Sequence, residues 1–118
     1  MDVMIPVIKK TKDGEEVVLI PFKDFSSVFT DPHNKNNQIC IYNRETYLVP
    51  STMNHWSIIL EQFTGLKVDR GVVVNKDKII DYDEKRDHVI LEDHSEYFVA
   101  LPYRKTIKSI KQQKKRPK

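Results

Sequence analysis

The chain has 118 residues, of which 39% are hydrophobic and 31% charged, with a formal net charge of +3. This length leaves room for one domain, and this apolar content is enough for a folded core. No apolar run approaches the roughly 20 residues of a membrane span, and the N-terminus lacks the pattern of a signal peptide, so we expect a folded cytoplasmic protein.

Before residue 50 the pattern predicts antiparallel strands. The predicted strands cover residues 3–8, 17–20, 26–29, 38–42 and 46–49. Asp13-Gly14 lies between the first two runs and is a strong signal for a two-residue hairpin turn. We expect residues 22–25 to form a short helical turn, and residues 31–37 to form a loop because Pro32 is their one apolar residue.

One amphipathic helix is predicted over residues 51–63. Ser51 or Thr52 supplies the N-cap, and Gly65 is a natural C-terminal stop. Apolar residues recur at a helical spacing that places them on one face: Met53, Trp56, Ile59, Leu60 and Phe63. The spacing predicts that this face covers a sheet, with Trp56 and Phe63 buried.

After Gly65 the chain again predicts strands. They cover residues 66–68, 72–74, 78–82, 88–91 and 97–101. Asn75 is expected to have a structural role, as the cap of one short helical turn after Val74. Pro102 suits the first position of a last helix, with Tyr103, Ile107 and Ile110 on one side.

Positive charge is concentrated at the C-terminal end. Residues 104–118 hold eight Lys and Arg and no acid, whereas the other 103 residues hold 12 basic and 17 acidic residues. Such an end is either a solvated tail or a segment that binds a polyanion. We expect one domain over residues 1–110 and a basic, flexible tail over residues 111–118.

The sequence does not predict an enzyme. The four histidines lack the spacing of a metal-binding helix, and Cys40 alternates with apolar residues in a predicted strand. With three glycines in all, the chain has no glycine-rich phosphate loop. We therefore expect no catalytic residues, no metal, no cofactor and no small-molecule substrate.

Residues 66–79 carry a more specific pattern. The tripeptide Asp69-Arg70-Gly71 is followed by three valines, then by Asn75 and a Lys-Ile ending at residue 79. A second signature spans residues 99–103, and an apolar start with an internal Asp lies at residues 20–25. In this order and spacing, over residues 3–110, the chain resembles the LytTR family of bacterial transcription regulators.

This resemblance implies a mainly β fold with small antiparallel sheets, one main α-helix and a short C-terminal helix. It also implies double-stranded DNA as the partner, bound by loops that enter successive major grooves, with two or more copies on direct-repeat sites. A homodimer on DNA and a protein inhibitor are further partners to consider. The DNA-binding candidates are His33, Lys35, Asn36, Asn37, Lys67, Arg70, Arg104 and Lys105.

The chain departs from the family pattern at three positions. Asp69 stands where a histidine is usual, and Leu101 and Pro102 replace an expected arginine. Arg104 and Lys105 follow within one turn and are the candidates to substitute for it. Asp69 either orients Arg70 through an ion pair or weakens binding by repelling phosphate.

Two alternatives remain open from the sequence. One is an interaction protein that keeps the fold, binds a regulator or a membrane-bound inhibitor, and has lost base-specific DNA binding. The other is an RNA-binding protein that stacks bases on exposed strand aromatics, for which the candidates are Tyr42, Tyr47, Tyr82 and Phe98.

Overall fold

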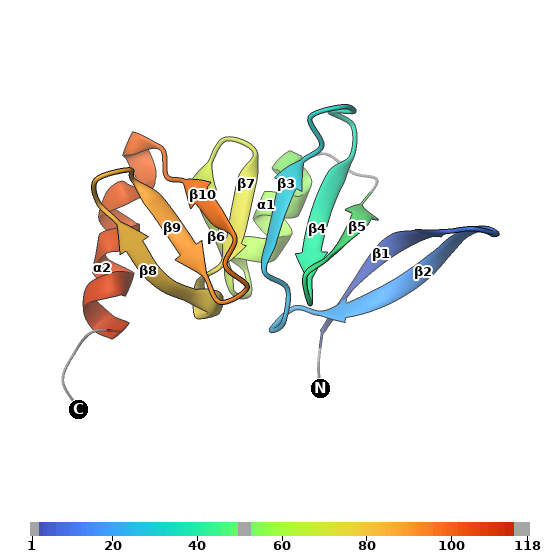
Figure 1. Cartoon of the computed structure of the whole chain (residues 1–118), viewed down its shortest axis with the longest axis horizontal. Coiled ribbons are helices and arrows are strands. Elements are labelled where there is room, and N and C mark those ends of the chain that lie inside the picture. The colour runs from blue at the N-terminus through green and yellow to red at the C-terminus, as the bar shows by residue number, and fades with distance from the viewer. Residues whose placement is uncertain (1–2, 50–52, 115–118) are drawn as a thin grey trace.

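The computed structural model of the chain describes residues 3–49 and 53–114 and is mainly β, as predicted (Figure 1). The predicted cap residues Ser51 and Thr52 lie outside this part of the chain. The helical segments are α1 (Met53–Glu61), η1 (Lys76–Lys78), η2 (Leu101–Tyr103) and α2 (Arg104–Lys114). The helix α2 therefore continues four residues past the predicted domain boundary at residue 110.

The strands form two antiparallel sheets. A seven-stranded sheet has the order β2-β1-β5-β4-β3-β7-β6, and a three-stranded sheet has the order β10-β9-β8. The strands of the larger sheet are β1 (Met4–Thr11), β2 (Gly14–Pro21), β3 (Ser27–Thr30), β4 (Gln38–Tyr42), β5 (Glu45–Val49), β6 (Gly65–Asp69) and β7 (Val72–Asn75). The smaller sheet contains β8 (Ile79–Asp83), β9 (His88–Leu91) and β10 (Glu96–Phe98).

The β1–β2 hairpin is confirmed, but its two-residue turn is Lys12-Asp13 rather than the predicted Asp13-Gly14. Thr11 pairs with Gly14 across the β1–β2 turn, where Gly14 has φ 133°. Asn43 and Arg44 join β4 to β5 with φ of 54° and 66°. Positive φ at both central residues is the mark of a type I′ turn, whose twist matches that of the strands.

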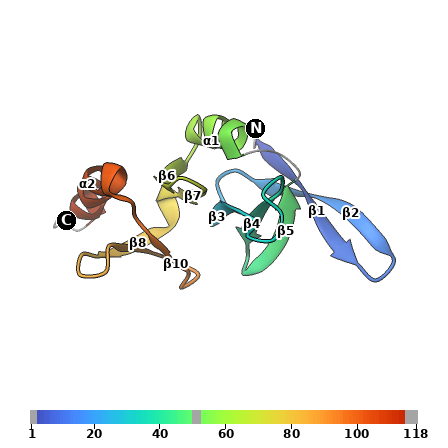
Figure 2. The ribbon, with the colours of Figure 1, turned by 90° about the horizontal axis from the view of Figure 1, so that it is seen from above.

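Different layers cover the two faces of the large sheet (Figure 2). On one face α1 contributes Met53 and Leu60 to a core with the strand residues of β1 to β5. On the other face β8, β9 and α2 pack against β6 and β7, and Ile107 of α2 is buried there. This second layer reaches β3 through Tyr97, whose ring lies 6.1 Å from that of Phe29 and whose hydroxyl shares a hydrogen bond of 2.6 Å with that of buried Ser27.

Two local predictions were wrong. Residues 22–24 form a hydrogen-bonded turn, in which the Asp24 N–H donates to the Pro21 carbonyl at 2.9 Å, rather than a helical turn. Phe63 and Ile59 are each 42% exposed, because α1 ends at Glu61 and Phe63 then stacks on Phe22 at a centroid distance of 4.3 Å. Trp56 is half-buried and packs against the core that α1 covers, as the spacing predicts.

Candidate nucleic-acid interface

The β3–β4 loop is held by its own polar side chains. The Asp31 carboxylate accepts from the His33 N–H at 2.9 Å, and the Asn34 side-chain oxygen accepts from the Asn36 N–H at 3.1 Å. Asx turns of this kind fix a backbone without using neighbouring elements. Asn34 is thus engaged in shaping the loop, while the side chains of His33, Lys35 and Asn36 are exposed.

The β6–β7 turn presents Arg70 to solvent. The Asp69 carboxylate accepts from the backbone N–H of Arg70 at 2.7 Å, and no ion pair joins it to a guanidinium among the described residues. Asp69 therefore orients the turn rather than the Arg70 side chain. The guanidinium keeps its full fork of donors for an outside partner.

Gly71 fixes this turn against the β3–β4 loop. The Thr30 N–H donates to the Gly71 carbonyl at 2.9 Å. A Cβ at residue 71 would lie 2.9 Å from Thr30 Oγ1, closer than such atoms approach in proteins. The glycine therefore permits a close contact between two segments that are about forty residues apart in the sequence.

The third segment, at η2 and the start of α2, is hydrogen-bonded to the strand that precedes the β6–β7 turn. The Ala100 N–H donates to the Val68 carbonyl at 2.8 Å, next to the β6–β7 turn. The Val99 N–H donates to the Asp87 carbonyl at 2.7 Å, and this bond connects the β8–β9 turn to the same segment. Residues 31–37, 69–71, 84–87 and 99–105 thus lie along one long edge of the molecule, the upper edge in Figure 1, which we call the loop end.

Arg104 is occupied by protein groups. Its Nε donates to the Val99 carbonyl at 2.9 Å, and its Nη1 lies 3.4 Å from the carboxylate of Asp87. The guanidinium carbon also lies 5.4 Å from the ring centroid of Phe98. Arg104 therefore locks the start of α2 onto the β8–β9 turn, and exposed Lys105 is the freer cation.

Asp87 is itself held by the second core. The buried Tyr82 hydroxyl donates to it at 2.6 Å, and burial together with this bond raises the pKa of Tyr82 to about 12. The phenol consequently stays a donor at neutral pH. Through the contacts of Asp87 with Tyr82 and with Arg104, the core of the smaller sheet is connected to the loop end.

Lys67 is the one candidate outside this cluster. It lies on β6 between Leu66 and Val68, which both pack in the second core. Because side chains alternate along a strand, Lys67 points to the opposite face, where it is half-buried. The structure thus brings seven of the eight predicted residues to the loop end and separates Lys67 from them.

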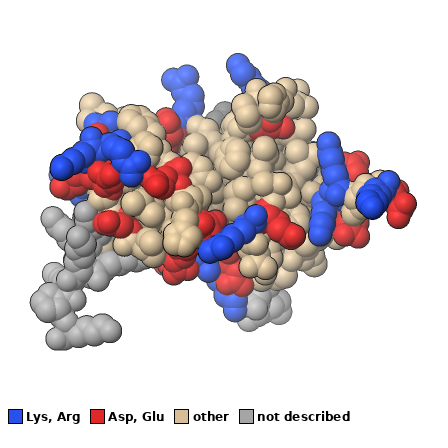
Figure 3. Space-filling model, viewed as in Figure 1, with Lys and Arg blue, Asp and Glu red and all other residues tan. Residues whose placement is uncertain are grey.

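The loop end carries a modest excess of positive charge. It contains six basic and four acidic residues. Arg86 is paired with Asp83 and Glu96 at 2.7 and 2.9 Å, so it contributes little free charge. Basic side chains project from the upper edge over the β6–β7 turn and the β3–β4 loop, where the sequence holds Arg70 and Lys35 (Figure 3).

Sequence reasoning missed two lysines of this region. Lys85 is exposed in the β8–β9 turn, and Lys108 lines a surface hollow with Lys105 and Leu101. The spacing of three between Lys105 and Lys108 places both on one side of α2 and was readable from the sequence. The position of Lys85 was not, because it depends on how the two sheets pack.

Asn75 has the structural role predicted for it. Its side-chain oxygen accepts from the Asp77 N–H at 3.0 Å and caps η1. Its Nδ2 donates to the carbonyls of Lys23 and Phe25 at 3.1 and 2.8 Å. The buried amide therefore joins β7 to the turn before β3.

Comparison with known proteins identifies the family of the chain. The family model of the LytTr DNA-binding domain matches residues 15–112, so the chain belongs to the LytTR family of DNA-binding domains. Its fold is similar to the solved LytTr DNA-binding domain of a protein described as a methyl-accepting/DNA response regulator from Bacillus cereus. That structure has a TM-score of 0.71 and 13% identity over 93% of this chain and 97% of the other. No curated protein matches the sequence.

The described residues contain neither a membrane-spanning helix nor a cluster of metal ligands. None of their helices is both long and apolar enough to cross a membrane. Among the same residues, no three His, Cys, Asp or Glu side chains come together as metal ligands would.

Proposed function

We propose that the loop end binds double-stranded DNA with sequence specificity, and that the protein regulates transcription without catalysing a reaction. The family assignment supports DNA as the partner. The observation that carries the finer proposal is the convergence of three separate loops at the loop end, with the Arg70 guanidinium free of ion pairs to described residues.

Each exposed side chain has a role that its chemistry suits. Arg70 would donate to O6 and N7 of one guanine, the pair of acceptors that an arginine fork matches. Asn36 and Asn37 would read an adenine edge from the neighbouring loop, with His33 beside them. Lys35 and Lys105 would contact phosphates, which position the protein without reading sequence. Arg104 would support binding by positioning α2, and Lys67 would contact a phosphate away from the loop end.

The experiment is a titration of purified protein against a selected duplex and its single-base variants at one salt concentration. Arg70→Ala should cost about 1–3 kcal/mol on the selected site and flatten the preference at one or two base pairs. Arg70→Lys should keep general affinity and lose part of that preference. Arg44→Ala is the matched control, because Arg44 is an exposed turn arginine at the other end of β4.

Asp69→Asn separates two effects of that carboxylate. The amide oxygen of Asn can still accept from the Arg70 N–H, so the turn should persist while the negative charge is removed. We expect tighter binding to all duplexes alike. If specificity is blurred instead, Asp69 orients the reading side chain.

A second candidate function is favoured by the segment at residues 101–105. Leu101 is 74% exposed and the Arg104 guanidinium is occupied, so this segment offers an apolar tip where the family pattern has an arginine. The protein would then bind a regulator or a membrane-bound inhibitor without reading bases. Arg70→Ala binding every duplex as the wild type does would favour this function.

We also propose that two or more copies bind together at direct-repeat sites. One loop end covers a short stretch of duplex, so adjacent copies would raise the total affinity through shared DNA. Footprinting on one and on two repeats tests this. Equal affinity for both would contradict it.

A further inference from the structure

The two sheets have four edge strands, and three of them are protected. The β6 register is irregular between Lys67 and Asp69, and the Val68 carbonyl accepts from Ala100. The β8 register is irregular between Ile79 and Asp81, and β10 has only three residues. Irregular, covered or very short edges are the usual means by which proteins prevent edge-to-edge pairing.

The fourth edge, β2, has none of these features. Its eight residues pair with β1 in an unbroken register from Pro21 to Gly14. It contains no lysine or arginine, and its one proline is the last residue. Residues 17–20 are all apolar, and two of their side chains are largely exposed: Val17 at 71% and Leu19 at 55%.

The outward backbone groups of β2 follow from the hairpin register. Thr11 and Gly14 flank a two-residue turn and therefore form a hydrogen-bonded pair, so residues 16, 18 and 20 bond to β1. The bond from the Phe22 N–H to the Val3 carbonyl at 2.9 Å continues this alternation. The N–H and C=O groups of Glu15, Val17 and Leu19 thus point away from the sheet, where no described residue meets them.

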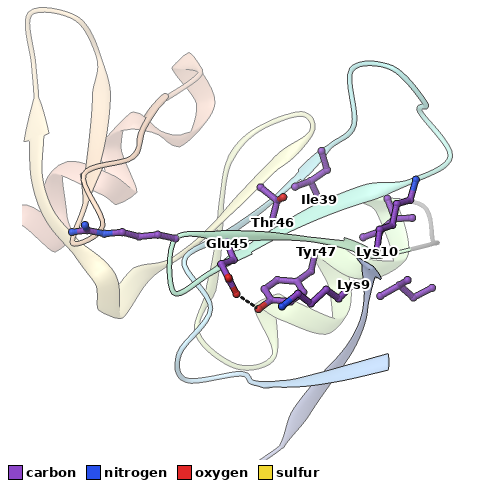
Figure 4. Close-up of a pocket in the computed structure, with 9 residues that line it drawn as sticks. Lys9, Lys10, Ile39, Glu45, Thr46 and Tyr47 are labelled. Atoms are coloured by element: carbon purple, nitrogen blue, oxygen red, sulfur yellow. Dashed lines mark hydrogen bonds between the residues drawn. The ribbon is translucent and has the colours of Figure 1, made fainter. Parts of the chain in front are cut away.

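A row of partly exposed apolar side chains ends at this edge. The register places Phe29, Ile39, Leu48, Ile8 and Val17 opposite one another across five strands. None of them belongs to either core cluster. Figure 4 shows Ile39 and Thr46 on this face and Tyr47 on the other, and Figure 3 shows few charges over β3 and β4.

We propose that β2 pairs antiparallel with β2 of a second copy of this chain, about a two-fold axis at Val18. In this register Val17 and Leu19 of the two copies face each other and exchange both N–H···O=C bonds, once on each side of the axis. All central pairs are then apolar. A register centred on Glu16 would oppose two carboxylates, which is unfavourable.

The occupant is a second copy because the edge is complementary to itself. The pairing also continues the apolar row into the other molecule. One strand pair buries less than the roughly 1,200 Å² that stable complexes need, so the dimer is weak and concentration-dependent. It forms without DNA and does not rest on the proposed function.

Sedimentation of the full chain without DNA tests the pairing. The average mass of the wild type should rise with concentration, and Val17→Lys should raise the dimer dissociation constant at least about tenfold, because an edge lysine opposes pairing. Ile58→Lys is the matched control, since Ile58 is a 62% exposed apolar residue on α1, and it should behave as the wild type. Circular dichroism confirms that each variant folds.

Cross-linking tests the register. Val18→Cys places two thiols at a non-hydrogen-bonded pair with Cβ atoms about 4.5–5.5 Å apart, near disulfide distance, so mild oxidation should form a dimer within each pair of copies. Ile58→Cys supplies the background rate, and buried Cys40 is common to all variants. A wild type that stays monomeric at every concentration, or Val18→Cys cross-linking no faster than Ile58→Cys, would overturn the pairing. Faster cross-linking through Val17→Cys would overturn the register. None of these results depends on DNA binding.

Discussion

Removal of the Asn75 amide should cost a large part of the protein's stability. Asn75 is fully buried and makes three side-chain hydrogen bonds, to Lys23, Phe25 and Asp77. At about 0.5–1.5 kcal/mol for each bond, Asn75→Ala should lower the free energy of unfolding by roughly 2–4 kcal/mol. Since small domains have only about 5–15 kcal/mol in total, urea denaturation measures this loss readily.

Asn75→Asp sharpens the test because it preserves shape. The second carboxylate oxygen would face the carbonyls of Lys23 and Phe25, to which the amide now donates. Burial and these oxygens should raise the pKa of the new carboxyl in the folded state. The loss relative to wild type should therefore be full above the raised folded-state pKa, shrink as pH falls through that pKa because the protonated group can donate again, and reach its minimum at about pH 4, the ordinary pKa of the unfolded carboxyl.

Asn36→Asp is the control for this substitution, because Asn36 is exposed in the β3–β4 loop. Its stability should match that of the wild type. A loss below about 1 kcal/mol for Asn75→Ala would refute the view that the amide is a main link between β7 and the turn before β3.

Four further outcomes are expected. Gly71→Ala should lower stability by about 1–3 kcal/mol through its contact with Thr30 Oγ1, and Thr30→Ala in the same chain should recover part of that loss in a double-mutant cycle. Cys40 should resist alkylation in the folded protein at pH 8 and react in urea, because burial raises the pKa of its thiol to about 12. The pKa of Tyr82 is raised from 10.0 to about 12, so its contribution to stability is full below pH 10 and is lost as pH rises toward 12. In Tyr82→Phe, the free energy of unfolding measured by urea denaturation should therefore decrease less between pH 10 and pH 12 than in the wild type. Deletion of residues 111–118 should reduce the slope of log K against log salt by about 0.9 for each phosphate that these residues neutralise, and an unchanged slope would show that they do not touch DNA.

Local sequence patterns determined most of the secondary structure. The existence of the β1–β2 hairpin, the loop over residues 31–37 and the cap at Asn75 each follow from the backbone preferences of a few adjacent residues, although the hairpin turn lies one residue earlier than predicted. The order of the motifs around Arg70 was enough to indicate the family, which the match over residues 15–112 establishes. Such signals are local or depend on the spacing of residues, so they can be read from the sequence without knowledge of tertiary contacts.

Tertiary structure alone decided which of these elements meet. The contact of Gly71 with Thr30 and that of Ala100 with Val68 assemble the loop end, and neither has a local signature. The exposure of Phe63 depends on where α1 ends over the sheet, and the engagement of Arg104 depends on the position of Asp87. Long-range packing also left β2 as an open edge, because the smaller sheet covers only the β6 and β7 end of the larger one.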